Sequence, residues 1–293
     1  MAHKAGFVNI LGNPNVGKST LMNKLVGEKL SIITNKSQTT RHRIMGIVNG
    51  EDFQIVYSDT PGIIKPSYRL QKSMMRFVDS AIEDADVILY VTDVVETPDK
   101  NTLYIERIKQ EDKPTLVLIN KIDQTDQMAL ESLVDQWAEK LPNAAILPIA
   151  AKHKLHVDRV FDYIMHHLPE SDPYFPKDEL TDRSIRFFAS EIIREKILLY
   201  YKQEVPYSVE VEIASYKEEE KITRIESNIY VVRESQKGIL IGNKGEKLKK
   251  VGTAARLDLE EFLGRKVFLE IVVKVDPDWR NNDKKLRKFG YIE

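Results

Sequence analysis

A glycine-lysine loop near the N-terminus has the residue types and spacing needed to bind phosphate. It reads GNPNVGKST and fits the pattern G-x-x-x-x-G-K-[ST]. The glycines let the backbone turn its N–H groups onto phosphate oxygens, and a helix that starts here adds positive potential. Lys18 is expected to reach the β- and γ-phosphates of a nucleoside triphosphate, and Ser19 to bind Mg²⁺. The predicted phosphate-binding residues are Gly12, Asn13, Pro14, Asn15, Val16, Gly17, Lys18, Ser19 and Thr20.

A second segment, NKID, is expected to select the base. Asn120, Lys121 and Asp123 follow the apolar run TLVLI, and the strand ends of a doubly wound sheet line its ligand crevice. The carboxylate of Asp123 would accept hydrogen bonds from N1–H and the exocyclic amine of guanine, a donor pair that adenine lacks. Leaving that carboxylate unpaired would be unfavourable, so the segment predicts GTP and argues against an ATP-dependent enzyme.

Two further segments are predicted to sense the γ-phosphate. DTPG follows the strand-like run FQIVYS; its aspartate can hold Mg²⁺ through water, and the N–H of its glycine can contact the γ-phosphate. Upstream, the polar stretch QTTRH is placed to bring a threonine hydroxyl onto Mg²⁺, with Thr40 preferred and Thr39 the alternative. Lys18, Thr40 and Gly62 are the predicted catalytic groups. The turn contributes the nucleotide-binding candidates Asp59, Thr60, Pro61, Gly62 and Ile63.

A second glycine loop, in KGILIGNKGEKLKK, cannot repeat the first. Its G-x-x-G spacing places no glycine at the required distance before a Lys-Ser or Lys-Thr pair. The loop joins two helical patterns inside the order α-β-β-α-α-β, which resembles a KH domain of the prokaryotic type. In such a domain the turn lets a polynucleotide backbone approach while an apolar groove receives bases. The predicted RNA-binding residues are Ile241, Gly242, Asn243, Lys244, Gly245, Lys247, Lys249 and Lys250.

The elements around these loops predict two domains. Residues 1–168 alternate short apolar runs with helical patterns, which indicates a mostly parallel doubly wound α/β sheet. The runs RIMGIVN and FQIVYSD, joined by NGED, predict one antiparallel edge strand. Residues 169–183 contain three prolines among charged residues and read as an exposed linker. Residues 184–293 predict an α+β domain with helices on one face of a three-stranded sheet, followed by a C-terminal tail.

Composition excludes several classes of protein. The chain has 293 residues, no apolar run near the length of a membrane span, and no cysteine for a disulfide framework. It starts without a signal-peptide pattern, so a cytoplasmic location is expected. The net charge of −1 gives no overall attraction to nucleic acid, so an RNA partner must meet a local basic patch.

Taken together, GNPNVGKST, QTTRH, DTPG and NKID resemble the translation-factor-related GTPases and, within them, the Era family. The resemblance implies a further guanine-contacting motif, S-A-K, matched here by Ala150, Ala151 and Lys152. Loss of the serine is expected to weaken the rigidity of that loop more than its specificity. Ile63 follows DTPG where Ras-like enzymes carry a glutamine that positions water. Slow intrinsic hydrolysis is therefore expected, stimulated by RNA or by K⁺ held at Asn15.

The same resemblance implies partners. It implies binding near the 3′ end of 16S ribosomal RNA, roles in processing that RNA and in assembly of the 30S subunit, peripheral contact with the cytoplasmic face of the inner membrane, and a monomer. The alternative is a membrane-associated or cell-cycle signalling GTPase whose C-terminal domain binds protein or lipid. Binding to RNA through the second glycine loop separates the two hypotheses.

Two smaller features complete the predictions. The tail DPDWRNNDKKLRKFGY mixes aromatic and basic residues, which suits either base stacking or an ordinary packed terminus. Arg194, Glu195 and Lys196, in the first helix of the second domain, read as a solvated helix face.

Overall fold

The computed structural model describes residues 2–97 and 100–292. It contains two compact units, Met1–Ser67 with Gln71–Asp182, and Arg183–Glu293 with Tyr68–Leu70. None of the helices in the described part of the chain combines the length and apolar character that a membrane span requires.

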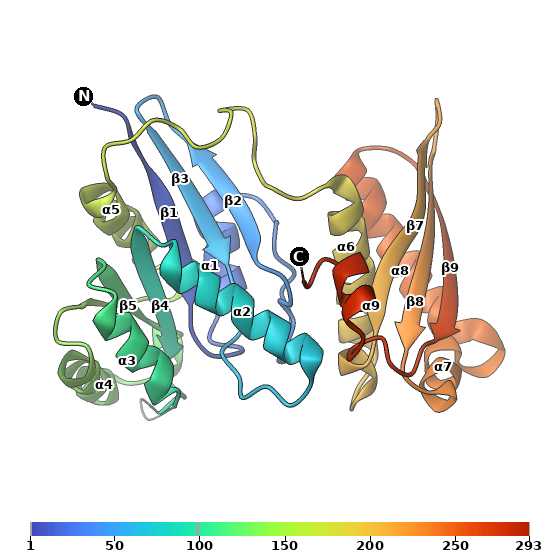
Figure 1. The fold of residues 1–293 in the computed structure, drawn as a ribbon, viewed down its shortest axis with the longest axis horizontal. Coiled ribbons are helices and arrows are strands. Elements are labelled where there is room, and N and C mark those ends of the chain that lie inside the picture. Colours follow the sequence, from blue (N-terminus) through green and yellow to red (C-terminus); the bar gives the residue numbers. More distant parts are fainter. Residues whose placement is uncertain (1, 98–99, 293) are drawn as a thin grey trace. The chain divides into compact units, whose positions relative to one another are not determined.

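The first unit is built on a six-stranded sheet in the order β2-β3-β1-β4-β5-β6 (Figure 1). Every residue of β4 and β5 is buried, as expected for central parallel strands covered on both faces. Only β2 runs antiparallel, and it lies at the sheet edge, which confirms the predicted fold class. The strands are β1 (Lys4–Leu11), β2 (Ile44–Asn49), β3 (Phe53–Asp59), β4 (Val87–Asp93), β5 (Thr115–Asn120) and β6 (Ala145–Pro148).

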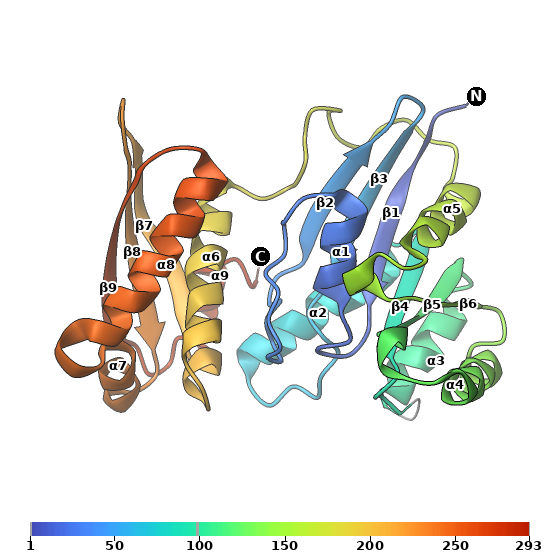
Figure 2. The same cartoon turned by 180° about the vertical axis from the view of Figure 1, so that it is seen from behind.

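Helices cover both faces of this sheet. Figure 1 shows α2 and α3 on one face, and Figure 2 shows α1 and α5 on the other. The helices are α1 (Lys18–Val26), α2 (Arg69–Glu83), α3 (Thr102–Gln110), α4 (Gln127–Lys140) and α5 (Val157–His167), with short 3-10 turns η1 (Ile122–Gln124) and η2 (Ala151–His153).

The segment predicted as a linker is exposed but attached to the first unit. The carbonyl of Leu180 accepts a hydrogen bond from the N–H of Ile47 at 2.8 Å, and the Thr181 hydroxyl donates to the carbonyl of Met45 at 2.6 Å. The side chain of Gln54 accepts from two further linker N–H groups. The linker thus covers part of the hydrogen-bonding edge of β2, which would otherwise be open to pairing with another chain.

The second unit has a three-stranded sheet in the order β7-β8-β9. Residues of β8 alternate between buried and less buried, so one face of the sheet packs on α6 and α8 around Ile193, Ile229 and Val251. The predicted α-β-β-α-α-β order is confirmed by α6 (Ile185–Tyr200), β7 (Glu210–Glu218), β8 (Thr223–Val231), α7 (Glu234–Ile241), α8 (Glu246–Leu263) and β9 (Val267–Val275). The remaining elements are the 3-10 turns η3 (Val205–Tyr207) and η4 (Asn243–Gly245), and α9 (Asp283–Lys288).

In this unit one prediction was wrong, and one of two open alternatives for the tail agrees with the structure. The Arg194 side chain is only 1% exposed and pairs with Glu191, while Lys196 pairs with Asp258, so the prediction of a solvated helix face was wrong. In the tail, Trp279 is fully buried and donates to the carbonyl of Ser208. The C-terminal segment is therefore packed, and this tryptophan is not available to stack on bases.

Candidate functional site

The nucleotide motifs meet in one pocket of about 760 Å³. The loop after β1, the stretch before β2, the turn after β3 and the loops after β5 and β6 all contribute to its walls. Among the predicted residues that line it are Pro14, Asn15, Gly17, Lys18, Ser19, Thr20, Thr39, Thr40, Gly62, Asn120, Lys121, Asp123 and Lys152.

Glycine is required at both ends of the first loop. Gly12 has φ +138°, and a Cβ there would lie 2.0 Å from the carbonyl oxygen of Val91. Gly17 has φ +103°, and a Cβ there would lie 2.2 Å from the side-chain nitrogen of Asn120. Larger residues would therefore separate the loop from its neighbouring strands and distort the phosphate cradle.

Lys18 is buried in the loop, with its ammonium donating to the carbonyls of Gly12 at 2.9 Å and Asn13 at 2.8 Å. Burial lowers its pKa to about 8, and the negative charges of Asp59 and Glu96 only partly oppose that shift. A phosphate would supply the negative charge that the buried ammonium lacks.

GTP affinity is accordingly expected to fall as pH rises above 8. Below about 8 the free lysine is already protonated, whereas above it only the phosphate-bound form keeps the proton, so binding takes up a proton. Affinity should then drop by up to about tenfold per pH unit. Calorimetry at pH 8.5 in buffers of different ionisation enthalpy would measure this uptake; proton release, or none, would contradict the prediction.

Three oxygen-bearing side chains gather beside the loop. The Ser19 hydroxyl lies 2.7 Å from Oδ2 of Asp59 and 2.9 Å from the hydroxyl of Thr40, which in turn lies 3.2 Å from the same Oδ2. Thr39 instead bonds Thr34 and donates to a backbone carbonyl. Of the two alternatives, Thr40 and not Thr39 therefore lies beside Ser19 and Asp59.

The chemistry of this cluster fits a hard cation. Oδ1 of Asp59 is buried and accepts no hydrogen bond of ordinary geometry from the described residues. Burial raises the pKa of Asp59, although Lys18, the Ser19 hydrogen bond and the nearby Ser31 hydroxyl act in the opposite direction. Mg²⁺ bound by oxygens would satisfy the free carboxylate oxygen and offset its desolvation.

The predicted guanine-contacting loops are joined to the phosphate loop. The Asn120 amide donates to the carbonyl of Val16 at 2.8 Å and accepts from the N–H of Ala151 at 3.0 Å. The ammonium of Lys121 donates to the carbonyl of Asn15 at 2.8 Å. Its Nζ also pairs with Asp93, at the end of β4.

Sequence reasoning missed two acidic partners of the pocket. Asp93 holds Lys121, and Glu96 accepts a hydrogen bond from Asn13 of the phosphate loop. Both stand at or just after the carboxyl end of the fully buried strand β4. The rule that strand ends line the crevice, applied to Asp93, would have found the first.

The DTPG turn packs against the phosphate loop. The Thr60 hydroxyl donates to the carbonyl of Ile10 at 2.7 Å, and the N–H of Ile63 donates to the carbonyl of Gly12 at 3.1 Å. A Cβ on Gly62 would lie 2.7 Å from Pro14. Ile63 is 3% exposed, so the residue that replaces a water-positioning glutamine is packed in the interior.

The second glycine loop borders a groove of about 410 Å³ between α8 and β9. Gly242 and Gly245 have φ +71° and +82°, and a Cβ at the second would meet nothing within 4 Å. The groove is lined by Leu248, Leu269 and Ile271 together with Lys249, Arg256 and small residues. Lys244, Lys247, Lys249 and Lys250 are all exposed, and the ammonium of Lys250 lies over the Tyr200 ring, 5.1 Å from its centroid.

Comparison with known proteins assigns both units. Residues 7–121 match the family model "50S ribosome-binding GTPase", and residues 204–280 match the family model "KH domain". GTPase Era of Staphylococcus haemolyticus is 43% identical over 99% of this chain and 98% of its own length. The chloroplastic GTPase ERA1 of Zea mays is also 43% identical, over 99% of this chain and 71% of its own.

Two solved structures agree over the whole chain. A variant of Aquifex aeolicus Era bound to GDP·AlF4⁻ superposes with a TM-score of 0.94 at 42% identity, covering 99% of this chain and all of that one. Era in complex with MgGDPNP and nucleotides 1506–1542 of 16S ribosomal RNA gives 0.95 at 42% identity with the same coverage. With its nucleotide motifs in one pocket, its KH domain and relatives of this similarity over their full length, the chain belongs to the Era family of GTPases.

Proposed function

We propose that this protein binds and hydrolyses GTP and uses its KH domain to bind 16S ribosomal RNA near the 3′ end, acting in processing of that RNA and in 30S subunit assembly. The observation that carries the proposal is the whole-chain likeness, with a TM-score of 0.95, to an Era bound to MgGDPNP and that RNA region. The pocket and the groove described above supply the matching chemistry in this chain.

In the proposed reaction, the backbone N–H groups of the first loop hold the phosphates and Lys18 neutralises the β- and γ-phosphate oxygens. Ser19 and Thr40 would bind Mg²⁺ directly and Asp59 through water. When bound, this ion adds positive charge where negative charge develops during phosphoryl transfer. The N–H of Gly62 would contact the γ-phosphate when that group is present, and the carboxylate of Asp123 would accept hydrogen bonds from guanine.

Potassium is the proposed helper ion for hydrolysis. The buried Ile63 cannot orient water, and the backbone of Asn15 has a positive φ of 68° in a residue that lines the pocket. We expect Asn15 to help hold K⁺ beside the phosphates, where it adds positive charge. GTP turnover without any partner should be slow in NaCl and several-fold faster in KCl, and this gain should be lost in Asn15→Ala. Equal rates in the two salts would contradict this role.

The proposed location is the cytoplasm, because ribosomal RNA is the proposed ligand; peripheral contact with the inner membrane stays a prediction from family resemblance, as does a monomeric state. The function is tested by crosslinking the protein to RNA in cells and sequencing the bound fragments. Enrichment of the 3′ region of 16S ribosomal RNA is expected. Enrichment of unrelated RNA, or of none, would contradict the proposal.

A further inference from the structure

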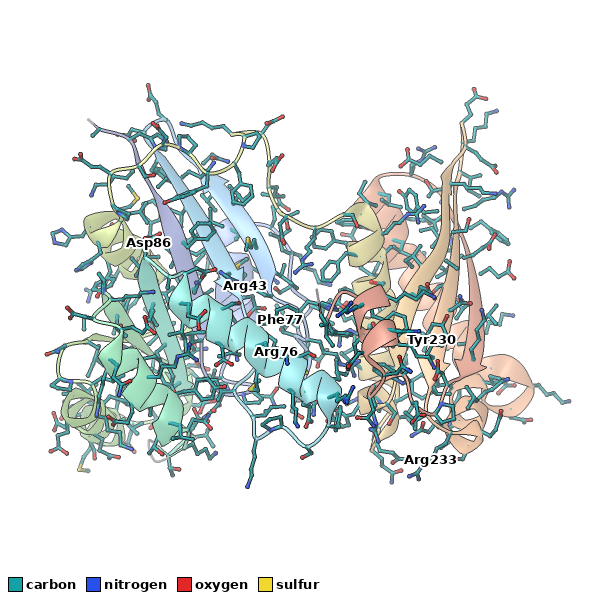
Figure 3. The ribbon with its side chains drawn as sticks, in the orientation of Figure 1. Arg43, Arg76, Phe77, Asp86, Tyr230 and Arg233 are labelled. Atoms are coloured by element: carbon teal, nitrogen blue, oxygen red, sulfur yellow. The ribbon has the colours of Figure 1, made fainter. Side chains whose placement is uncertain are left out.

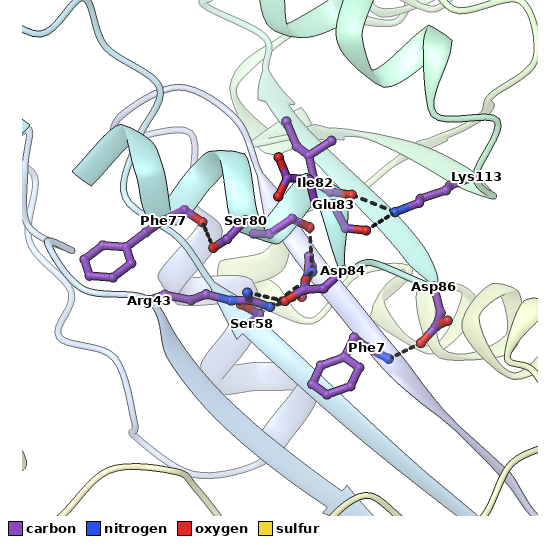
Figure 4. Close-up of polar contacts among 12 residues, drawn as sticks. Phe7, Arg43, Ser58, Phe77, Ser80, Ile82, Glu83, Asp84, Asp86 and Lys113 are labelled. Atoms are coloured by element: carbon purple, nitrogen blue, oxygen red, sulfur yellow. Dashed lines mark hydrogen bonds and ion pairs between the residues drawn. The ribbon is translucent and has the colours of Figure 1, made fainter. Parts of the chain in front are cut away.

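A second buried polar cluster lies beside α2 and centres on Arg43 (Figure 4). Its guanidinium makes a two-pronged contact with Asp84, at 2.5 Å from Nη1 to Oδ2 and 2.9 Å from Nη2 to Oδ1. Nε donates to the hydroxyl of Ser58 at 2.6 Å, and Nη2 also donates to Oδ1 of Asn9 at 3.2 Å. The Arg43 side chain is 7% exposed and that of Asp84 is 44% exposed.

Arg43, Ser58 and Asn9 each stand within three residues of a predicted nucleotide-binding residue, whereas Asp84 comes from the far end of α2. Arg43 follows Thr40 by three residues and immediately precedes β2, while Ser58 immediately precedes Asp59. Asp84 follows the end of α2, the helix downstream of the DTPG turn. Asn9 lies in β1, three residues before Gly12. The Arg43 guanidinium therefore contacts three parts of the first unit. Ser58 lies in the strand that ends at Asp59, Asp84 follows the helix after the DTPG turn, and Asn9 lies in the strand that leads into the phosphate loop.

Neighbouring contacts hold the cluster to α2. The amide of Asn9 donates to the carbonyl of Ala81 at 2.6 Å and to Asp84 at 2.7 Å. The ring of His42 lies 6.1 Å from that of Phe77. Figure 3 labels Phe77 on α2. The stretch after Thr40 is thus packed on α2 as well as paired in the sheet, where Ile44 stands opposite Asp59.

We propose that Arg43 is a positioning residue for the GTP-bound state. Its two-pronged pair with Asp84 fixes the C-terminal end of the Thr40 segment, so that the Thr40 hydroxyl is held beside Ser19 and Asp59. A bidentate arginine-carboxylate pair is suited to this because its geometry is specific as well as strong, and lysine cannot reproduce it. The proposal rests on the assignment of Thr40 to Mg²⁺. Because Thr40 is proposed to bind Mg²⁺ only when the γ-phosphate is present, loss of this contact should weaken the binding of GTP and not that of GDP.

The test compares affinities for GDP and for a non-hydrolysable GTP analogue, by calorimetry at fixed Mg²⁺, in Arg43→Lys and Asp84→Asn. Both variants should bind the GTP analogue about tenfold more weakly, while GDP affinity stays within about twofold. The double variant should lose no more than either single one, because both remove the same pair. Asp84→Asn changes a partly exposed side chain and preserves its size, so it keeps the test informative if Arg43→Lys unfolds.

Arg107→Lys is the matched control. Arg107 joins α3 to α2 through ion pairs with two carboxylates, Asp79 at 2.7 Å and Glu83 at 2.8 Å. Arg107→Lys should change the affinity for neither GDP nor the GTP analogue. This control therefore distinguishes a general loosening of α2 from an effect on the Thr40 segment.

Thr40→Ala distinguishes failure of this inference from failure of the assignment on which it rests. It should show the same GTP-selective loss; if it does not, Thr40 is not the ligand. The proposal is overturned if Thr40→Ala is GTP-selective but the Arg43 and Asp84 variants are not. Equal weakening of GTP-analogue and GDP binding would show that the pair has only a structural role, and no weakening of either would show that it has none. A GTP-selective loss at Arg43 without one at Thr40 would overturn it too.

Discussion

Asp123→Asn is expected to weaken GTP binding by about 100-fold and to make xanthosine triphosphate the better ligand. The carboxylate that we propose accepts two hydrogen bonds from guanine would be replaced by an amide that presents a donor. Xanthine has an oxygen where guanine has the exocyclic amine, so the amide regains a partner. Competition of the two nucleotides against a fluorescent GTP analogue would measure the reversal, and heat protection by GTP but not ATP should hold for the unchanged protein.

The neighbouring Asp126 provides the control. It caps α4 by accepting a hydrogen bond from the N–H of Ala129 at 2.9 Å, and asparagine caps helices equally well. Asp126→Asn should therefore leave both affinities unchanged. A parallel loss of GTP and xanthosine triphosphate binding in Asp123→Asn would show that this residue supports the loop and does not read the base.

Replacing Gly242 and Gly245 together by aspartate is expected to reduce affinity for a 16S ribosomal RNA 3′ fragment by about 100-fold. Each added carboxylate near a phosphate costs about 1 kcal/mol even in water, and loss of the close backbone approach adds a similar amount. Filter binding at two salt concentrations should show the weaker affinity and a shallower salt dependence. GTP affinity should be unchanged, since the nucleotide pocket belongs to the other compact unit.

Gly264→Asp is the control for charge and backbone strain in the same unit. Gly264 ends α8 with φ +65°, and a Cβ there would meet nothing within 4 Å. This variant should keep its RNA affinity. If the double aspartate variant also keeps it, the KH hypothesis fails, and a C-terminal domain that binds protein or lipid becomes the better explanation.

Local sequence predicted the loops of the nucleotide site because their geometry is encoded locally. Gly12 and Gly17 adopt positive φ angles, which glycine favours over other residues, and the apolar run of β5 ends directly at Asn120. The same reasoning found the glycine loop at Gly242 and the alternating strand β8, since both depend on neighbours in sequence.

The burial of charged residues was harder to predict because some of their partners are distant in the sequence. Helical spacing alone made Arg194 and Lys196 look solvated, yet Lys196 pairs with Asp258, 62 residues later. A charged side chain can be buried only when such a partner and its hydrogen bonds are in place. The residues of α6 alone do not indicate that Asp258 is the partner of Lys196.

The linear order of residues was enough to predict a phosphate loop, an aspartate proposed to bind guanine and a second glycine loop of a different kind. Tertiary contacts were needed to place Thr40, and not Thr39, beside Ser19 and Asp59, to pair Lys121 with Asp93, and to join Arg43 to Ser58, Asn9 and Asp84. The physical reason is the range of the interactions. Backbone turns are set by adjacent residues, whereas the selection between Thr39 and Thr40 depends on hydrogen-bond partners that come together only when separate strands pair and helices pack.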